Sequence, residues 1–114
     1  MQAVAGGVYV LPYFPHRENK EEGEARWVIL LENHISTVLI VPLTKQVHQI
    51  KHYPKSFLIK KDSAEGRQMG LLHDSLVLVE RVTDMSHFVI SKATQKGVCP
   101  DEILDKIQEL ITTN

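Results

Sequence analysis

Two apolar runs between residues 26 and 44, RWVILLENHISTVLIVPLT, constrain the fold more than any other feature of the chain. One run ends at Leu31 and the other spans 37–43, with a polar break between them. Each run is rich in Val, Ile and Leu and is too short for a typical helix, which favours two strands joined by a tight connection and buried on most of both faces. If the strands pair antiparallel, Arg26 and Thr44 lie near the same end of the hairpin.

Four further segments have the composition of strands. Residues 7–14 are rich in β-formers, and Pro12 cannot donate a ladder hydrogen bond, so that strand either lies at a sheet edge or ends early. Leucine and valine alternate within 75–82 as in a strand that is half-buried toward its end. Short strands are also expected at 55–61 and 88–92.

The connecting segments are mostly polar. Residues 15–25 are charged and contain a glycine, which predicts an exposed loop. Residues 45–54 fit either a single helical turn or an irregular loop. Turns are expected at 62–68 and 83–86.

The clearest helix is the last element, at about 100–112. Pro100 suits the first helical position, and Asp101 and Glu102 favour the positive end of the helix dipole. Five apolar side chains form one stripe at helical spacing: Ile103, Leu104, Ile107, Leu110 and Ile111. The expected fold class is therefore mainly β with a C-terminal helix (α+β), as a small SH3-like barrel or a curled antiparallel sheet.

Length and composition set broad limits. The 114 residues favour one domain, 1–114, and the net charge of −1 does not indicate a nucleic-acid binder by itself. The distribution is uneven, because residues 45–61 carry five lysines and no acid. Cys99 is the only cysteine, which excludes an intrachain disulfide and fits a reducing cytosol. No secretory signal and no apolar run near 18 residues is present, so we expect a cytoplasmic protein without a membrane span.

Six histidines raise the question of a metal site. His48 and His52 are four residues apart, a spacing that suits ligation only on a helix, and no cysteine or carboxylate lies near them in the sequence. Neither a metal nor another cofactor is therefore expected.

The order of motifs along the chain resembles the MazF/PemK family of toxin endoribonucleases from bacterial toxin–antitoxin pairs. The resemblance covers nearly the whole chain, and the order and spacing of the motifs carry it rather than any one of them. The motifs are GVYVLPYF at 7–14, ARWVILLEN at 25–33, IVPLT at 40–44, GLLHDSLVLVERV at 70–82 and KGVCPDEILDKIQEL at 96–110.

This resemblance implies a MazF/PemK-like barrel, a homodimer and metal-independent cleavage of single-stranded RNA. It also implies neutralisation by a cognate antitoxin that wraps the barrel. The family's catalytic arginine and threonine match Arg26 and Thr44. The family usually has proline after this arginine, where the chain has Trp27.

Five other residues are candidates for RNA contact. Lys45 and Gln46 directly follow Thr44, and His48 belongs to the lysine-rich stretch, whose interleaved aromatics are able to stack bases. His16 and Arg17 lie in the first loop, which flanks the site in the family.

Two other functions compete with the ribonuclease. One is a non-catalytic toxin-like binding module on the same barrel, either a degenerate ribonuclease or a protein-binding toxin. Trp27 and the acidic EEGE loop are the kind of changes expected in an RNA site that has lost its activity. The Ile-Thr-Thr-Asn terminus is evidence against a relative of the gyrase-poison toxins. The other is a small regulatory or structural partner recognised by its strand edges.

Overall fold

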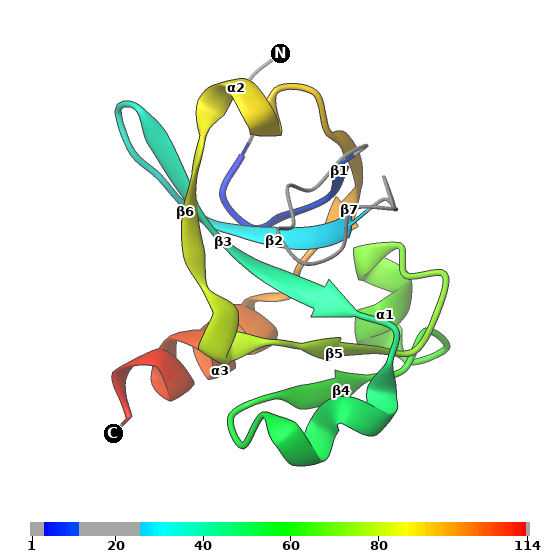
Figure 1. The fold of residues 1–114 in the computed structure, drawn as a ribbon. Helices are drawn as coiled ribbons and strands as arrows, with labels where there is room; N and C mark the ends of the chain where they lie inside the picture. The colour runs from blue at the N-terminus through cyan, green and yellow to red at the C-terminus, as the bar shows by residue number, and fades with distance from the viewer. Residues whose placement is uncertain (1–3, 12–25, 114) are drawn as a thin grey trace, which may run out of the picture.

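The computed structural model describes residues 4–11 and 26–113, and within them a curled antiparallel sheet is the central element (Figure 1). The strand order is β4-β5-β3-β2-β1-β7, and β6 also pairs with β3. This confirms the expected fold class, mainly β with a C-terminal helix. The strands are β1 (Gly7–Leu11), β2 (Arg26–Asn33), β3 (Thr37–Thr44), β4 (Phe57–Ile59), β5 (Ser75–Val77), β6 (Thr83–Ser86) and β7 (Thr94–Val98).

The β2–β3 hairpin lies at the middle of the sheet, as the two apolar runs predicted. Val28 faces Pro42 and Leu30 faces Ile40, and an irregularity at Leu31 then shifts the register by one residue. β2 continues through Asn33, so the first two residues of the polar break belong to the strand and the connection begins at His34. Alternate side chains enter two separate clusters, one on each face of the sheet.

β1 is paired on both sides, with β2 and with β7. The edge position offered for this strand is therefore wrong, and residues 12–14 lie outside the described part of the chain. β7 was not expected from the sequence, because TQKGV has no apolar alternation and four of its five side chains are exposed. Its backbone bonds to β1 define it as a strand.

One edge of β3 is shared by two strands. β5 pairs with the C-terminal end of β3, and β6 pairs with its N-terminal half. Between them lies the 3-10 helix η2 (Val79–Arg81), so the strand expected over 75–82 is confirmed only for 75–77. The turn expected at 83–86 is wrong, because β6 occupies these residues. Leucine–valine alternation does not reveal such an interruption, since both conformations bury these side chains.

Two short helices also replace other predictions. α1 (Ala64–Met69) occupies the expected turn at 62–68, and α2 (His87–Ile90) occupies most of the strand expected at 88–92. A serine caps each N-terminus, and Ser63 Oγ accepts a 3.0 Å hydrogen bond from the Gly66 N–H. η1 (Val47–His52) is a 3-10 helix, which supports the helical alternative for 45–54.

The C-terminal helix α3 (Asp101–Thr112) confirms the strongest helical pattern. Ile107 is fully buried, and the other four apolar side chains of the stripe pack against the same cluster. Pro100 is the N-cap residue and not the first helical residue as expected. A membrane-spanning helix needs about 20 apolar residues, and no helix within residues 4–11 and 26–113 meets that requirement.

Candidate active site

A cavity of about 520 Å³ opens where β2 begins and β3 ends. The hairpin register places Val28 opposite Pro42, so two residues further on Arg26 is level with Thr44. Both side chains line the cavity, together with residues of η1 and of the segment 71–81. The sequence prediction that these two residues lie at the same end of the hairpin is therefore confirmed.

Thr44 is paired with β5 and lies at the end of β3 where β2 begins. It is level with Arg26 on one side and opposite Leu76 of β5 on the other. Its Oγ1 accepts a 3.2 Å hydrogen bond from the Gln46 N–H. The hydroxyl hydrogen remains available to a phosphate oxygen, because this bond uses only an acceptor position.

Arg26 is half-buried at the start of β2, where it pairs with Leu11 of β1. Trp27, which follows it, is also half-buried, lines the cavity and packs against the larger core cluster. Trp27 therefore contributes to the cavity lining while it packs against the core cluster on one face of the sheet.

The charge of the cavity has one sign among the described residues. Its lining includes the cationic Arg26, Lys45 and Arg81, and no aspartate or glutamate of the described chain belongs to it. Such a lining favours a phosphate group irrespective of the sequence that carries it.

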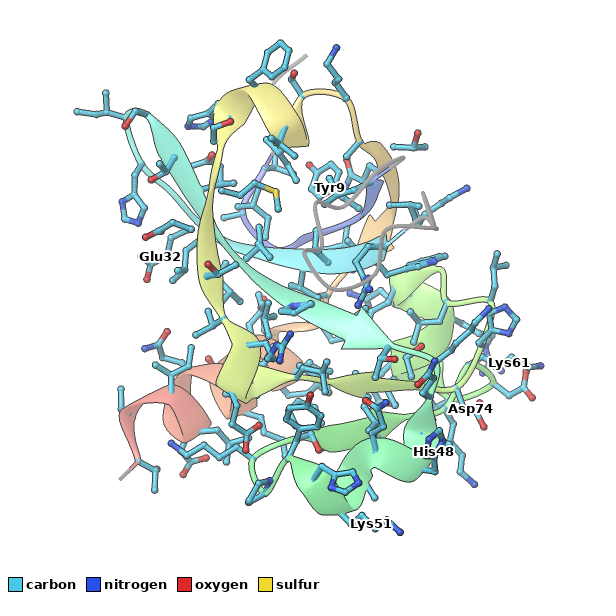
Figure 2. All side chains as sticks on the ribbon, in the orientation of Figure 1. Tyr9, Glu32, His48, Lys51, Lys61 and Asp74 are labelled. Atoms are coloured by element: carbon cyan, nitrogen blue, oxygen red, sulfur yellow. The ribbon has the colours of Figure 1, made fainter. Side chains whose placement is uncertain are left out.

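The segment 70–75 forms the far wall and is anchored at several points. Leu71 N–H donates to Gly66 O at 3.0 Å, and Asp74 Oδ1 accepts from the Lys61 N–H at 2.9 Å. Figure 2 shows Lys61 and Asp74 side by side at this end of the molecule. Ser75 Oγ donates to His73 O at 2.8 Å, so the hydroxyl completes a local turn and has no triad partner in that bond.

The other candidates for RNA contact fall into three groups. Lys45 and Gln46 line the cavity, whereas His48 is exposed on η1 and lies outside the cavity lining (Figure 2). His16 and Arg17 lie outside the described residues.

Tyr53, one of the aromatics interleaved in the lysine-rich stretch, lines the cavity. Three other lining residues were not singled out from the sequence: Gln49, His73 and Arg81. Gln49 comes from η1, and Arg81 comes from η2. These segments have no regular period, so spacing alone gave no signal that their side chains converge on Thr44.

Metal ligation has no support from the described residues. Within residues 4–11 and 26–113, no three His, Cys, Asp or Glu side chains are grouped closely enough to hold a metal ion.

Comparison with known proteins gives the family. A family model described as "PemK-like, MazF-like toxin of type II toxin-antitoxin system" matches residues 5–113. The chain belongs to the PemK/MazF-like toxin family.

Solved structures show that the PemK/MazF-like fold is shared. Among solved structures, 47 chains match this chain, and one of them is in the crystal structure of MazE-MazF (Form-II) from Deinococcus radiodurans. That chain is 18% identical, superposes with a TM-score of 0.69, and the match covers 97% of this chain and 93% of that one. No curated protein matches the chain.

Proposed function

We propose that this PemK/MazF-like toxin is an endoribonuclease that cuts single-stranded RNA without a metal ion. The observation that carries the proposal is the cavity in which Arg26 and Thr44, the family's catalytic pair by motif, lie on one wall. The cationic lining supports it, because a phosphodiester is the charged part of any RNA strand.

RNA supplies its own nucleophile. The 2′ oxygen attacks the adjacent phosphorus, the bond to the 5′ oxygen breaks, and a 2′,3′-cyclic phosphate and a 5′-hydroxyl result. The enzyme has to stabilise negative charge on the phosphoryl oxygens and to assist proton transfer. The planar, permanently charged guanidinium of Arg26 suits those oxygens and the leaving 5′ oxygen, and the Thr44 hydroxyl positions the phosphate.

Partners follow from the same proposal. The structural neighbour was solved as a MazE-MazF complex, which supports a cognate antitoxin protein as the partner that neutralises this chain. A homodimer and a cytoplasmic location complete the proposal, together with single-stranded RNA as the substrate.

A second function is favoured by one observation. Trp27 stands where the family usually has proline, and its half-buried side chain forms part of the cavity wall. A tryptophan in the lining at this family position favours a non-catalytic binding module on the same fold.

Cleavage of a long single-stranded RNA in the presence of EDTA separates the two functions. The wild-type protein should cut at a short recurrent sequence, and Arg26→Ala or Thr44→Ala should lower the rate by about 10²–10³-fold. Arg67→Ala and Thr83→Ala, exposed positions outside the cavity lining, are the matched controls and should keep the wild-type rate.

The alternative has its own outcome in this experiment. A folded wild-type protein that leaves every RNA intact would exclude the ribonuclease and favour the binding module. Trp27→Pro would then test whether the indole is what closes the site.

A further inference from the structure

Two glutamine side chains form a hydrogen-bonded pair at the rim of the cavity. Gln49 Nε2 donates to Gln46 Oε1 at 2.8 Å, and both residues line the cavity. They are the only side-chain amides among the described lining residues. Gln46 is exposed and Gln49 is half-buried.

The backbone fixes this pair relative to Thr44. Gln46 N–H donates to Thr44 Oγ1 at 3.2 Å. This bond holds the backbone of Gln46 next to the hydroxyl that is proposed to position the phosphate. Gln49 N–H donates to Gln46 O at 3.0 Å in the 3-10 helix η1. Residues three apart eclipse each other in a 3-10 helix, which brings the two side chains together.

The pair leaves a defined set of hydrogen-bonding positions on Gln49. Its amide has one carbonyl oxygen and two N–H hydrogens, and Gln46 takes one of those hydrogens. The acceptor and the remaining donor lie side by side on one planar edge when Gln46 takes the hydrogen that points away from the carbonyl oxygen, and the proposal below uses that arrangement. Glutamine with this free edge binds adenine in two bonds, accepting from N6 and donating to N7.

We propose that Gln49 recognises adenine next to the phosphate held at Thr44, and that Gln46 is the positioning residue that orients the Gln49 amide. The proposal rests on the proposed function and adds the base preference of the same site. Single-stranded RNA exposes the base edges that such an amide needs.

The cationic and aromatic lining residues do not supply this preference. Arg26, Lys45 and Arg81 attract phosphate in any sequence. The ring of Tyr53, the residue that ends η1, lines the same cavity and offers a stacking surface, which every base is able to use. Among the described lining residues, only the two glutamines have side chains that carry a donor and an acceptor on one planar amide.

Cut-site mapping on a random pool of single-stranded RNA tests the role of Gln49. The wild-type protein should require adenine at one position next to the cut, and Gln49→Ala should relax that preference by about tenfold to a hundredfold. Gln49→Glu replaces the donor with a second acceptor, so the preferred base should change from adenine to cytosine, whose N4 amino group donates. Gln108→Glu, an exposed change of the same kind on α3, should keep the wild-type preference.

Variants of Gln46 separate positioning from structure. Gln46→Leu removes the acceptor for Gln49 and should weaken the adenine preference, measured as the ratio of cuts beside adenine to cuts beside the other bases. Gln46→Glu keeps an acceptor oxygen and should restore this ratio. A merely structural role of Gln46 would give both variants the same ratio, whatever their cutting rates.

Binding to uncleavable 2′-deoxy oligonucleotides keeps this inference separate from the proposed catalysis. The ratio of affinities for an adenine-only and a cytosine-only strand should fall in Gln49→Ala and reverse in Gln49→Glu. If the wild-type protein cuts RNA but Gln49→Ala keeps its base preference, the inference is wrong and the ribonuclease stands. If the folded protein cuts nothing, the ribonuclease is wrong, and an affinity ratio unchanged in both Gln49 variants would overturn the inference as well.

Discussion

The thiol of Cys99 lies between β7 and α3, where the chain turns from the sheet edge into the last helix. Its backbone N–H donates to Gly6 O at 2.7 Å, and the residue is 1% exposed. Burial raises the pKa of the thiol from 9.0 to about 12, and the carboxylates of Asp101 and Glu102 add to the shift. The environment therefore keeps this sulfur protonated, as expected of a small packing residue and not of a nucleophile.

Alkylation of the native protein should consequently be slow at Cys99. Iodoacetamide at pH 8 should leave the folded protein unmodified and should label it rapidly in guanidinium chloride, because unfolding exposes the thiol and returns its pKa to the ordinary range. Mass spectrometry of the intact protein measures both rates. Rapid labelling of the folded protein would contradict this account.

The same shift makes stability depend on alkaline pH. Above pH 9 the unfolded thiol ionises while the folded one stays protonated up to about 12, so the free energy of unfolding falls as pH rises in this window. Between pH 8 and 10 the loss from this group is about 1.4 kcal/mol. Urea unfolding at pH 8 and pH 10 should show that the wild type loses more unfolding free energy between these pH values than Cys99→Ala does. Equal losses in the two proteins would exclude this contribution.

At the residue scale, the sequence predicted the part of the site that depends on strand register. Arg26 and Thr44 meet because an antiparallel hairpin brings its two ends together. Gln49 and Arg81 were missed because 3-10 helices place them, and such helices are too short to leave a periodic pattern. The meeting of two candidate site residues on strands is thus predictable, whereas that of their neighbours on irregular segments is not.

At the element scale, the short helices were lost for a related reason. α1 and α2 have six and four residues, which is too little for an apolar stripe to repeat. Their capping serines were present in the sequence as local signals, and Gly70 ends α1 at a φ of 75°, where an L side chain is strained. β7 was missed because its side chains face solvent and only its backbone bonds define it.

The approach of α1 to β7 depends on Gly97. A Cβ at this position would meet the backbone of Gln68 and Met69, which has little room to move. Gly97→Ala should therefore reduce the free energy of unfolding by about 1–3 kcal/mol through overpacking. Thr94→Ala, an exposed change in the same strand, is the control and should cost less than that. Urea midpoints at equal m-values measure both changes, and a Gly97 variant as stable as the control would show that the two elements separate easily.

At the scale of the whole molecule, the central hairpin determines most of the architecture. Because both of its faces are apolar, it requires cover on each side, and α3 supplies one face and α2 the other. Periodicity predicted the hairpin and α3, the two elements with long apolar patterns. The division of one β3 edge between β5 and β6 was not predictable, since it depends on long-range pairing.

The protein has a net charge of −1, whereas the described lining of the cavity is cationic. We therefore expect RNA affinity to depend on the charges at the cavity and not on the net charge. If Lys45 neutralises one phosphate, Lys45→Ala should reduce the slope of log affinity against log salt by about 0.7 for a single strand. Lys92→Ala removes the same charge from a position outside the cavity lining and should leave the slope unchanged. Anisotropy titrations with a 2′-deoxy oligonucleotide at several salt concentrations measure both slopes. Equal reductions in the two variants would mean that the salt dependence of binding follows the total charge of the protein. The cavity would then not be the site that binds the phosphate backbone.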